Sequence, residues 1–495
     1  MNCLRRWSVL AWPTMLLLFA APARGDAPQT SSKGDSSSTP EKWRLDRSLT
    51  LSASAEATPA LAYRLWPMIW ERKDGNAVPI YLRLNHEQND AARRDWSETP
   101  KKWVTIPLKE IPLAQAKDFL NHWKNFLRQL ELGAQRKTAE WNYTLDQGSV
   151  IDILLPDAQM MRSYVPMLLL KARVELAEGN YVAAAHWLQT GLSFSQHVSK
   201  GPFLINSLVG IAGADQFLDV VLDFVERPGA PNLYWSLTDL PRPLIDLRDG
   251  VDHEYHVVEM EFPDLANLSA PRPPEEWDAA LKRIRTRIHE MVDGLAEGSP
   301  KDRRWWSTPI PGTGPADPAS KSSELEEARK RVATRRKLSP EAVEAMPPAQ
   351  VLILDMKDTY DGIRDEWFKG VYLPYPQAQR VLAESQAHVK AAPGSEGKRL
   401  AGLLPAIEKV QRAEMRIDRK IAALRVIEAL RLYAAEHDGR LPDKLSDVTA
   451  VPVPKDPGTE QPFEYRREGN QATLIGRIPG DRLQDTGLRY RLTTR

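Results

Sequence analysis

The sequence predicts a mainly α chain, with an irregular helical-hairpin body and a small α+β domain at its C-terminal end. From about Thr58 onwards, apolar residues recur at spacings of three and four, which is the periodicity of helices that bury one face. Alternation of apolar and polar residues, which is typical of half-buried strands, is confined to roughly the last thirty residues. Segments rich in proline and glycine separate the helical stretches, as expected of a body built from many short hairpins.

The first 23 residues have the pattern of a secretory signal peptide. Arg5 and Arg6 precede the apolar stretch WSVLAWPTMLLLFA, and the small residues Ala21 and Ala23 flank Pro22 at the predicted cleavage site. The alternative is an uncleaved membrane anchor, which we disfavour because the apolar run is shorter than the ~20 residues of a spanning helix. We therefore expect an exported protein that is periplasmic or associated with the cell envelope.

Cysteine usage and charge exclude several classes of function. The single cysteine, Cys3, lies inside the predicted signal peptide, so the mature chain is expected to have no disulfide, thiolate metal ligand or cysteine nucleophile. The 67 basic and 66 acidic residues nearly balance, which predicts no whole-protein electrostatic field that would hold nucleic acid or an anionic membrane. We expect contact with a membrane only through the signal peptide before its cleavage. Residues 24–55 contain the polar stretch DAPQTSSKGDSSSTPE and are predicted to form a disordered Ser/Pro linker.

Residues 56–405 are predicted to form the helical body. Breakers such as ERPGAPN and SAPRPPEE separate its helical windows. The windows lie around residues 112–133, 157–178, 181–197, 203–226, 273–296 and 347–369.

The stretch KARVELAEGNYVAAAHWLQTGLS, residues 171–193, predicts a helical hairpin that turns at Gly179 and Asn180. Gly179, Tyr181 and Ala184, with small residues at 172 and 191, make it resemble a tetratricopeptide repeat. Lys171 stands where that repeat usually has leucine, and Gln196 where it usually has proline. No second copy follows at the 34-residue period of such repeats, so we favour a single structural hairpin over a peptide-binding array.

Residues 406–495 are predicted to form one helix followed by a small antiparallel sheet. Three strand-like segments, FEYRRE, QATLIGRI and LRYRLTT, follow the helix, with a tight turn at Gly469 between the first two. The helix is expected to be continuous over 411–437 and to place Arg425 outward. Its apolar stripe consists of Ile417, Ile421, Leu424, Ile427, Leu430 and Ala434.

This C-terminal stretch resembles the soluble part of type II secretion pseudopilins over about sixty residues. Leu430, Tyr433, Gly439 and Pro442 match the end of the long helix in that family, and Asp456, Pro457, Pro462 and Tyr465 match the segment that leads into its sheet. The resemblance implies a long helix packed on a small sheet. Taken over most of its length, the chain also resembles a family of exported proteins from planctomycete-type bacteria, and this second resemblance implies no activity.

The only residues with the spacing of metal ligands are Asp249, His253 and His256, which would share one helical face at i, i+4 and i+7. A solvated polar face is the favoured interpretation, so we predict no metal and no cofactor. The adjacent residues Arg303, Arg304, Trp305 and Trp306 form a possible partner contact, since arginine and tryptophan are enriched in interface hot spots. The basic run from Arg329 to Lys337 is interpreted as a solvated helix, with contact to an acidic partner as the alternative.

No glycine-rich phosphate loop, dinucleotide fingerprint or nucleophile elbow is present in the sequence. The sequence therefore predicts an exported binding or scaffolding protein with a protein partner in the cell envelope, and more weight falls on a non-enzymatic role. The alternative is a secreted hydrolase whose catalytic residues are distant in the sequence.

Overall fold

The chain is divided between two units, each of which joins segments that are distant in the sequence. The computed structural model describes residues 41–86, 94–96, 98–142, 150–296, 321–391, 396–404 and 407–495. Unit 1 is built mainly from residues 248–409, and unit 2 from residues 41–141, 157–247 and 410–495. Most of the described chain is helical and the larger sheet is small, which confirms the predicted fold class.

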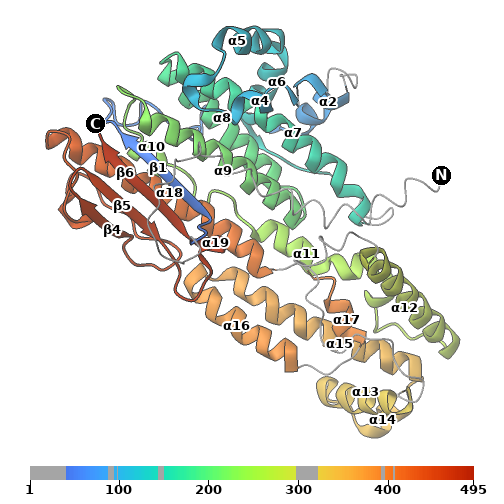
Figure 1. Cartoon of the computed structure of the whole chain (residues 1–495). Coiled ribbons are helices and arrows are strands. Elements are labelled where there is room, and N and C mark those ends of the chain that lie inside the picture. The colour runs from blue at the N-terminus through green and yellow to red at the C-terminus, as the bar shows by residue number, and fades with distance from the viewer. Residues whose placement is uncertain are drawn as a thin grey trace. The chain divides into compact units, whose positions relative to one another are not determined.

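Unit 1 consists of helices. Its long helix α15 is surrounded by α11, α12, α13, α16 and α17 (Figure 1). Trp277 of α12 and Tyr360 of α15 are fully buried in the main apolar cluster of this unit. The elements are α11 (Arg248–Glu261), η2 (Pro263–Leu265), α12 (Pro274–Ala296), α13 (Lys321–Arg336), α14 (Pro340–Glu344), α15 (Pro348–Phe368), η4 (Lys369–Tyr372), α16 (Tyr375–Ala391) and α17 (Glu396–Ala401).

Unit 2 combines a helical layer with a sheet. The predicted hairpin is present, since α7 ends at Ala177, Gly179 has a φ of +81°, and α8 begins at Tyr181. Its helices and short strands before the long C-terminal helix are β2 (Lys73–Asn76), α2 (Val78–His86), α4 (Lys101–Val104), η1 (Leu108–Glu110), α5 (Leu113–His122), α6 (Lys124–Ala134), β3 (Arg136–Thr138), α7 (Val150–Ala177), α8 (Tyr181–Ser199), α9 (Leu204–Glu226) and α10 (Tyr234–Thr238).

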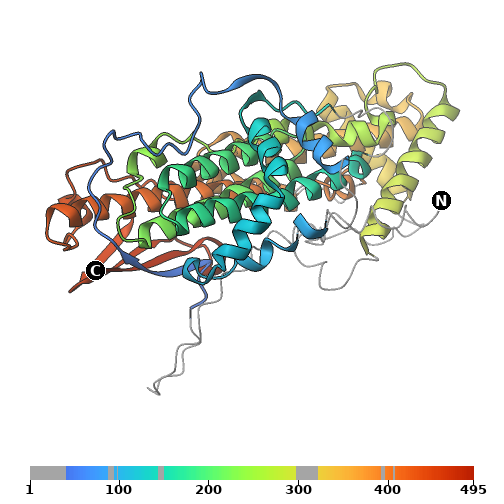
Figure 2. The same cartoon turned by 90° about the horizontal axis from the view of Figure 1, so that it is seen from above.

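Helices α8 and α9 run side by side at short distance, as the green ribbons of Figure 2 show. Gly191 of α8 makes this approach possible, because a Cβ atom there would lie 2.2 Å from the ring of Phe217 in α9. Gly210 of α9 also allows the close approach, because a Cβ atom at this position would lie 2.6 Å from the carbonyl oxygen of Ser195 in α8. The small residue that the sequence places at 191 is therefore required by packing.

The larger sheet has the strand order β1-β6-β5-β4 and lies along one side of helix α18 (Figures 1 and 2). Strands β4, β5 and β6 form the predicted antiparallel meander. The sequence did not predict β1, which pairs parallel to β6. The remaining elements of unit 2 are β1 (Leu45–Leu51), α18 (Ile407–Glu436), η5 (Leu445–Asp447), β4 (Glu464–Glu468), β5 (Gln471–Gly476), α19 (Leu483–Thr486) and β6 (Leu488–Thr494).

Strand β1 differs from the disordered linker expected over residues 24–55. Of that range the structure describes residues 41–55, in which Leu49 and Leu51 are buried and pair with Leu492 and Thr494. The sequence signal is weak because the strand is short and follows a long polar stretch, while its pairing partner is at the other end of the chain. The predicted signal peptide, residues 1–23, lies outside the described residues.

Helix α18 is continuous, as predicted, but it is buried on more than one face. Leu424, Ile427 and Leu430 of the predicted stripe are inaccessible to solvent. Arg425, which was expected to point outward, donates a hydrogen bond of 3.1 Å to the Tyr234 hydroxyl and is only partly exposed. A single apolar stripe therefore describes only part of the surroundings of this helix.

The residues behind the pseudopilin resemblance have clear local roles. Gly439 ends α18 with a φ of +79°, a conformation that glycine adopts without steric cost. Asp456 accepts hydrogen bonds from the Arg419 side chain at 2.7 Å and from the Gly458 backbone at 2.8 Å. The Tyr465 hydroxyl donates to the Pro442 carbonyl at 2.9 Å. These contacts fasten the segment between α18 and the sheet.

No helix within the described ranges is both long enough and apolar enough to cross a membrane.

Close packing of α8 on α9 predicts that Gly191→Ala destabilises the protein by roughly 1–3 kcal/mol, because the new methyl group has to displace the buried Phe217 ring. Gly362→Ala is the matched control, since Gly362 is exposed within α15 and a Cβ atom there would have no atom within 4 Å. The control should be unchanged or more stable by up to about 1 kcal/mol. Equal free energies of unfolding for both variants in urea titrations would contradict the prediction.

A buried histidine predicts acid sensitivity of unit 2. Burial, followed by the charge of Arg72, lowers the pKa of His197 from 6.5 to about 4, and its Nδ1 lies 3.0 Å from the Tyr81 hydroxyl. Between pH 6.5 and about 4 the unfolded chain binds a proton that the folded chain does not, so stability falls as the pH is lowered through this range.

The loss attributable to His197 should reach roughly 3 kcal/mol at pH 4. His197→Asn, whose amide oxygen can take the place of Nδ1, should show a smaller difference in unfolding free energy between pH 7 and pH 4. The same change at the exposed His122 should leave the wild-type difference intact. An undiminished acid effect in the His197 variant would refute this assignment.

Candidate binding groove

The predicted metal-binding residues lie on the surface of α11 in unit 1. Asp249, His253 and His256 are all exposed, and His253 Nδ1 lies 3.0 Å from the backbone carbonyl oxygen of Asp249. Among the residues that the structure describes, no three histidine, cysteine, aspartate or glutamate side chains are grouped so as to hold a metal ion. This helix face therefore has no additional ligand from the described parts of unit 1.

Of the other two predicted contact surfaces, the structure describes only the basic run. Arg303, Arg304, Trp305 and Trp306 lie outside the described residues. The basic run was interpreted as a solvated helix, but its side chains bind within unit 1. Arg331 forms two hydrogen bonds with Asp355, at 2.8 and 2.9 Å, and Arg336 forms two with Asp358, at 2.9 and 2.7 Å.

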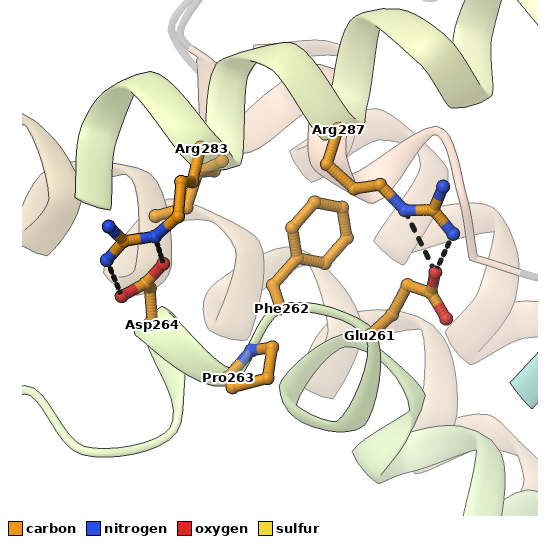
Figure 3. Close-up of a pocket in the computed structure, with 7 residues that line it drawn as sticks. Glu261, Phe262, Pro263, Asp264, Arg283 and Arg287 are labelled. Atoms are coloured by element: carbon orange, nitrogen blue, oxygen red, sulfur yellow. Dashed lines mark hydrogen bonds and ion pairs between the residues drawn. The ribbon is translucent and has the colours of Figure 1, made fainter. Parts of the chain in front are cut away.

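A cavity of about 420 Å³ lies in unit 1, between the end of α11 and helix α12. In Figure 3 the ring of Phe262 lies between two ion pairs, Arg283 with Asp264 and Arg287 with Glu261. Because each guanidinium is bound to a carboxylate, this cavity offers no unpaired charge from these two arginines. We therefore regard it as a weaker candidate than the groove of unit 2.

A groove of about 650 Å³ in unit 2 is the stronger candidate for a binding site. Four helices line it, α5, α6, α7 and α8, so it lies on the predicted hairpin. Leu120, Leu127 and Val174 are buried at its base, and the half-buried Trp187 adds an aromatic surface. Apolar and aromatic side chains surrounded by a few polar groups are typical of ligand sites.

Charged side chains flank this apolar base, and the acidic ones are mostly paired. Lys117 donates to Glu178 at 2.6 Å, and Lys171 donates to Glu175 while its ammonium lies 5.8 Å from the centre of the Trp187 ring. Lys171, at the position where a tetratricopeptide repeat usually has leucine, thus contacts two residues that line the groove.

The ionisation of the groove carboxylates is fixed by these partners. A hydrogen bond with His186, at 2.7 Å, lowers the pKa of Glu131. Burial raises the pKa of Glu175, but hydrogen bonds from Lys171 and Asn180 outweigh it and lower the pKa overall. Both carboxylates are therefore charged at neutral pH and already engaged, so neither is a free general base.

Lys124 and Arg128 are the cations of the groove that remain available. They lie one turn apart on α6, are exposed, and form no hydrogen bond or ion pair with another described residue. An apolar base beside two available cations suits a segment that combines an apolar side chain with a carboxylate.

The comparisons with known proteins give no match. No family model, no curated protein and no solved structure matches the chain. The tetratricopeptide, pseudopilin and planctomycete-type resemblances therefore stay predictions that rest on the residues that suggested them.

The groove is not among the sites that the sequence predicts. The sequence predicts the hairpin that supplies Trp187 and places the unusual Lys171 in it, but it indicates no role for the helices α5 and α6. One signal was available, since Lys117, Leu120 and Asn121 follow each other at spacings of three and one, which places them on one face of α5. Which helix faces α7 and α8 is a tertiary property that this spacing does not contain.

The exposed histidine face predicts that the protein holds no tight metal. Protein purified without chelator should contain less than one equivalent of zinc, because three exposed side chains without a further ligand bind a divalent ion weakly. Elemental analysis measures this directly. One equivalent of zinc that is lost in His253→Ala would show that the face is a metal site.

Proposed function

We propose that the protein is an exported binding or scaffolding protein of the periplasm or cell envelope, and that its groove holds a segment of a partner protein. Export is supported by the signal-peptide pattern of residues 1–23. Binding is supported by one observation above all, the half-buried Trp187 over the buried base of Leu120, Leu127 and Val174. Aromatic residues in such surroundings carry a large share of the energy of many interfaces.

The chemistry of the partner segment follows from the groove. Its apolar side chain would cover Trp187, and its acidic side chains would bind Lys124 and Arg128, since the other two groove lysines already have carboxylate partners. The alternative function, a secreted hydrolase, gains little support here, because Glu131, Glu175 and Glu178 are all held in hydrogen bonds. Asp118 is the remaining carboxylate of the groove, and it is exposed to solvent.

Trp187→Ala should strongly weaken capture of the partner. The full mature chain, carrying a photo-crosslinking side chain in place of Asn121 at the groove, would be irradiated in native cell envelope, and the crosslinked proteins identified by mass spectrometry. We expect one partner whose yield falls at least about tenfold with Trp187→Ala, since a hot-spot truncation costs about 2 kcal/mol or more.

Val182→Ala is the matched control, because Val182 lies on the same helix, has 67% of its surface exposed and does not line the groove. It should give the wild-type yield. The same crosslinked proteins at undiminished yield with Trp187→Ala, in a variant of unchanged unfolding temperature, would mean that the groove is not the binding site.

A further inference from the structure

A tight turn in unit 2 presents two large apolar side chains to solvent. The turn runs from Met68 to Glu71, where the Glu71 backbone N–H donates to the Met68 carbonyl at 3.0 Å. The carboxylate of Glu71 closes the same turn from the other side, accepting a hydrogen bond of 2.7 Å from the Met68 N–H. Ile69 and Trp70 occupy the two central positions, and each has 75% of its surface exposed.

This residue choice is opposite to the usual one. The central positions of turns favour glycine, proline, asparagine and aspartate, for conformational reasons and because they face water. Ile69 and Trp70 gain nothing from the fold at this exposure. The fold nevertheless holds the turn in place, because Leu65 and Trp66 just before it are buried and the Arg72 guanidinium lies 5.2 Å from the Trp66 ring centre.

Basic side chains adjoin the turn on a two-stranded sheet. Strand β2 follows the turn directly and pairs with β3, which brings Lys73 opposite Arg136. Lys73 and Lys137 are exposed. The cations of this region are Arg72, Lys73, Arg136 and Lys137, and its carboxylates are Glu71 and Asp74. Lys137 is paired with Asp74 at 2.6 Å, and the Arg72 guanidinium lies against the buried Trp66, whereas the exposed Lys73 forms no ion pair with another described residue.

We propose that the Met68–Glu71 turn is an anchor for the interface of an anionic lipid bilayer. Tryptophan prefers the boundary between headgroups and acyl chains, and Ile69 beside it would add apolar burial. Lys73, which is exposed and follows the turn by two residues, then lies next to the inserted side chains, where an anionic headgroup layer attracts it. This contact is additional to the signal peptide and does not depend on the groove.

A bilayer fits the turn better than a protein pocket does. The apolar surface consists of two adjacent side chains, and the cations beside it outnumber the carboxylates by four to two. A shallow apolar insertion reinforced by cations is the usual composition of a peripheral membrane contact.

Sedimentation of the full mature chain with lipid vesicles tests the proposal. Vesicles of phosphatidylcholine mixed with phosphatidylglycerol should sediment the wild-type protein, and vesicles of phosphatidylcholine alone should do so less. Replacing both apolar residues, Ile69→Ser with Trp70→Ser, should weaken binding roughly tenfold or more through lost apolar burial. Lys73→Gln should weaken it about fivefold, and added salt should weaken wild-type binding.

Val182→Ser is the control, since it removes an equally exposed apolar residue outside the turn and should leave binding unchanged. Equal sedimentation of the wild-type protein and the Ile69/Trp70 double variant would overturn the proposal. Failure of the wild-type protein to sediment with either kind of vesicle would also overturn it, and would leave an apolar protein pocket as the partner of this turn.

Discussion

The guanidinium of Arg431 is buried in unit 2 together with the carboxylate of Glu428, and both side chains are inaccessible to solvent. Removing two such charges from water costs several kcal/mol per ion, and their attraction offsets this only if the remaining polar atoms are also bonded. Arg431 meets that condition by donating to the backbone carbonyls of Ser52 at 2.8 Å and Ala230 at 2.9 Å as well as to Glu428. The end of β1, the loop before α10 and the long helix must therefore come together for unit 2 to fold.

Further buried cations with carboxylate partners lie along α18. Arg419 donates to Asp456 at 2.7 Å and to the Thr486 carbonyl at 2.7 Å, which joins the helix to the segments before β4 and β6. Lys420 binds Asp215 of α9, and burial would lower its pKa, but the carboxylates outweigh burial and raise it. Because a buried cation tolerates few alternative partners, these contacts fix which elements meet α18, whereas apolar burial alone would allow the helix to rotate or slide.

The sequence predicts the helices and strands well, but it predicts poorly which of them pack against each other, and α18 shows why. Its apolar period correctly indicates a long helix, yet Arg419, Lys420, Glu428 and Arg431 look in sequence like ordinary solvated side chains. Strand β1 was missed for a related reason, since Asp46 and its partner Arg489 are 443 positions apart. The groove, too, could be predicted only in part. Its hairpin could be predicted from Gly179 and the helical period, but the opposing helices α5 and α6 could not, because local spacing does not encode which faces meet.

The pairing of charged side chains within each unit also indicates which surfaces remain available to bind a partner. In unit 1, the Arg331 and Arg364 side chains are bound to carboxylates of the same unit, so their charges stabilise the helix packing instead of remaining available. In unit 2, the large buried cations are likewise paired with groups of the same unit. Apolar side chains remain accessible at Trp187 and Trp70, and each of them lies near cations on the surface. Accessible apolar surface releases water when a partner covers it, while surface cations select the charge of that partner. The combination is found in the groove and in the turn, and this is why we propose that unit 2 carries the binding surfaces.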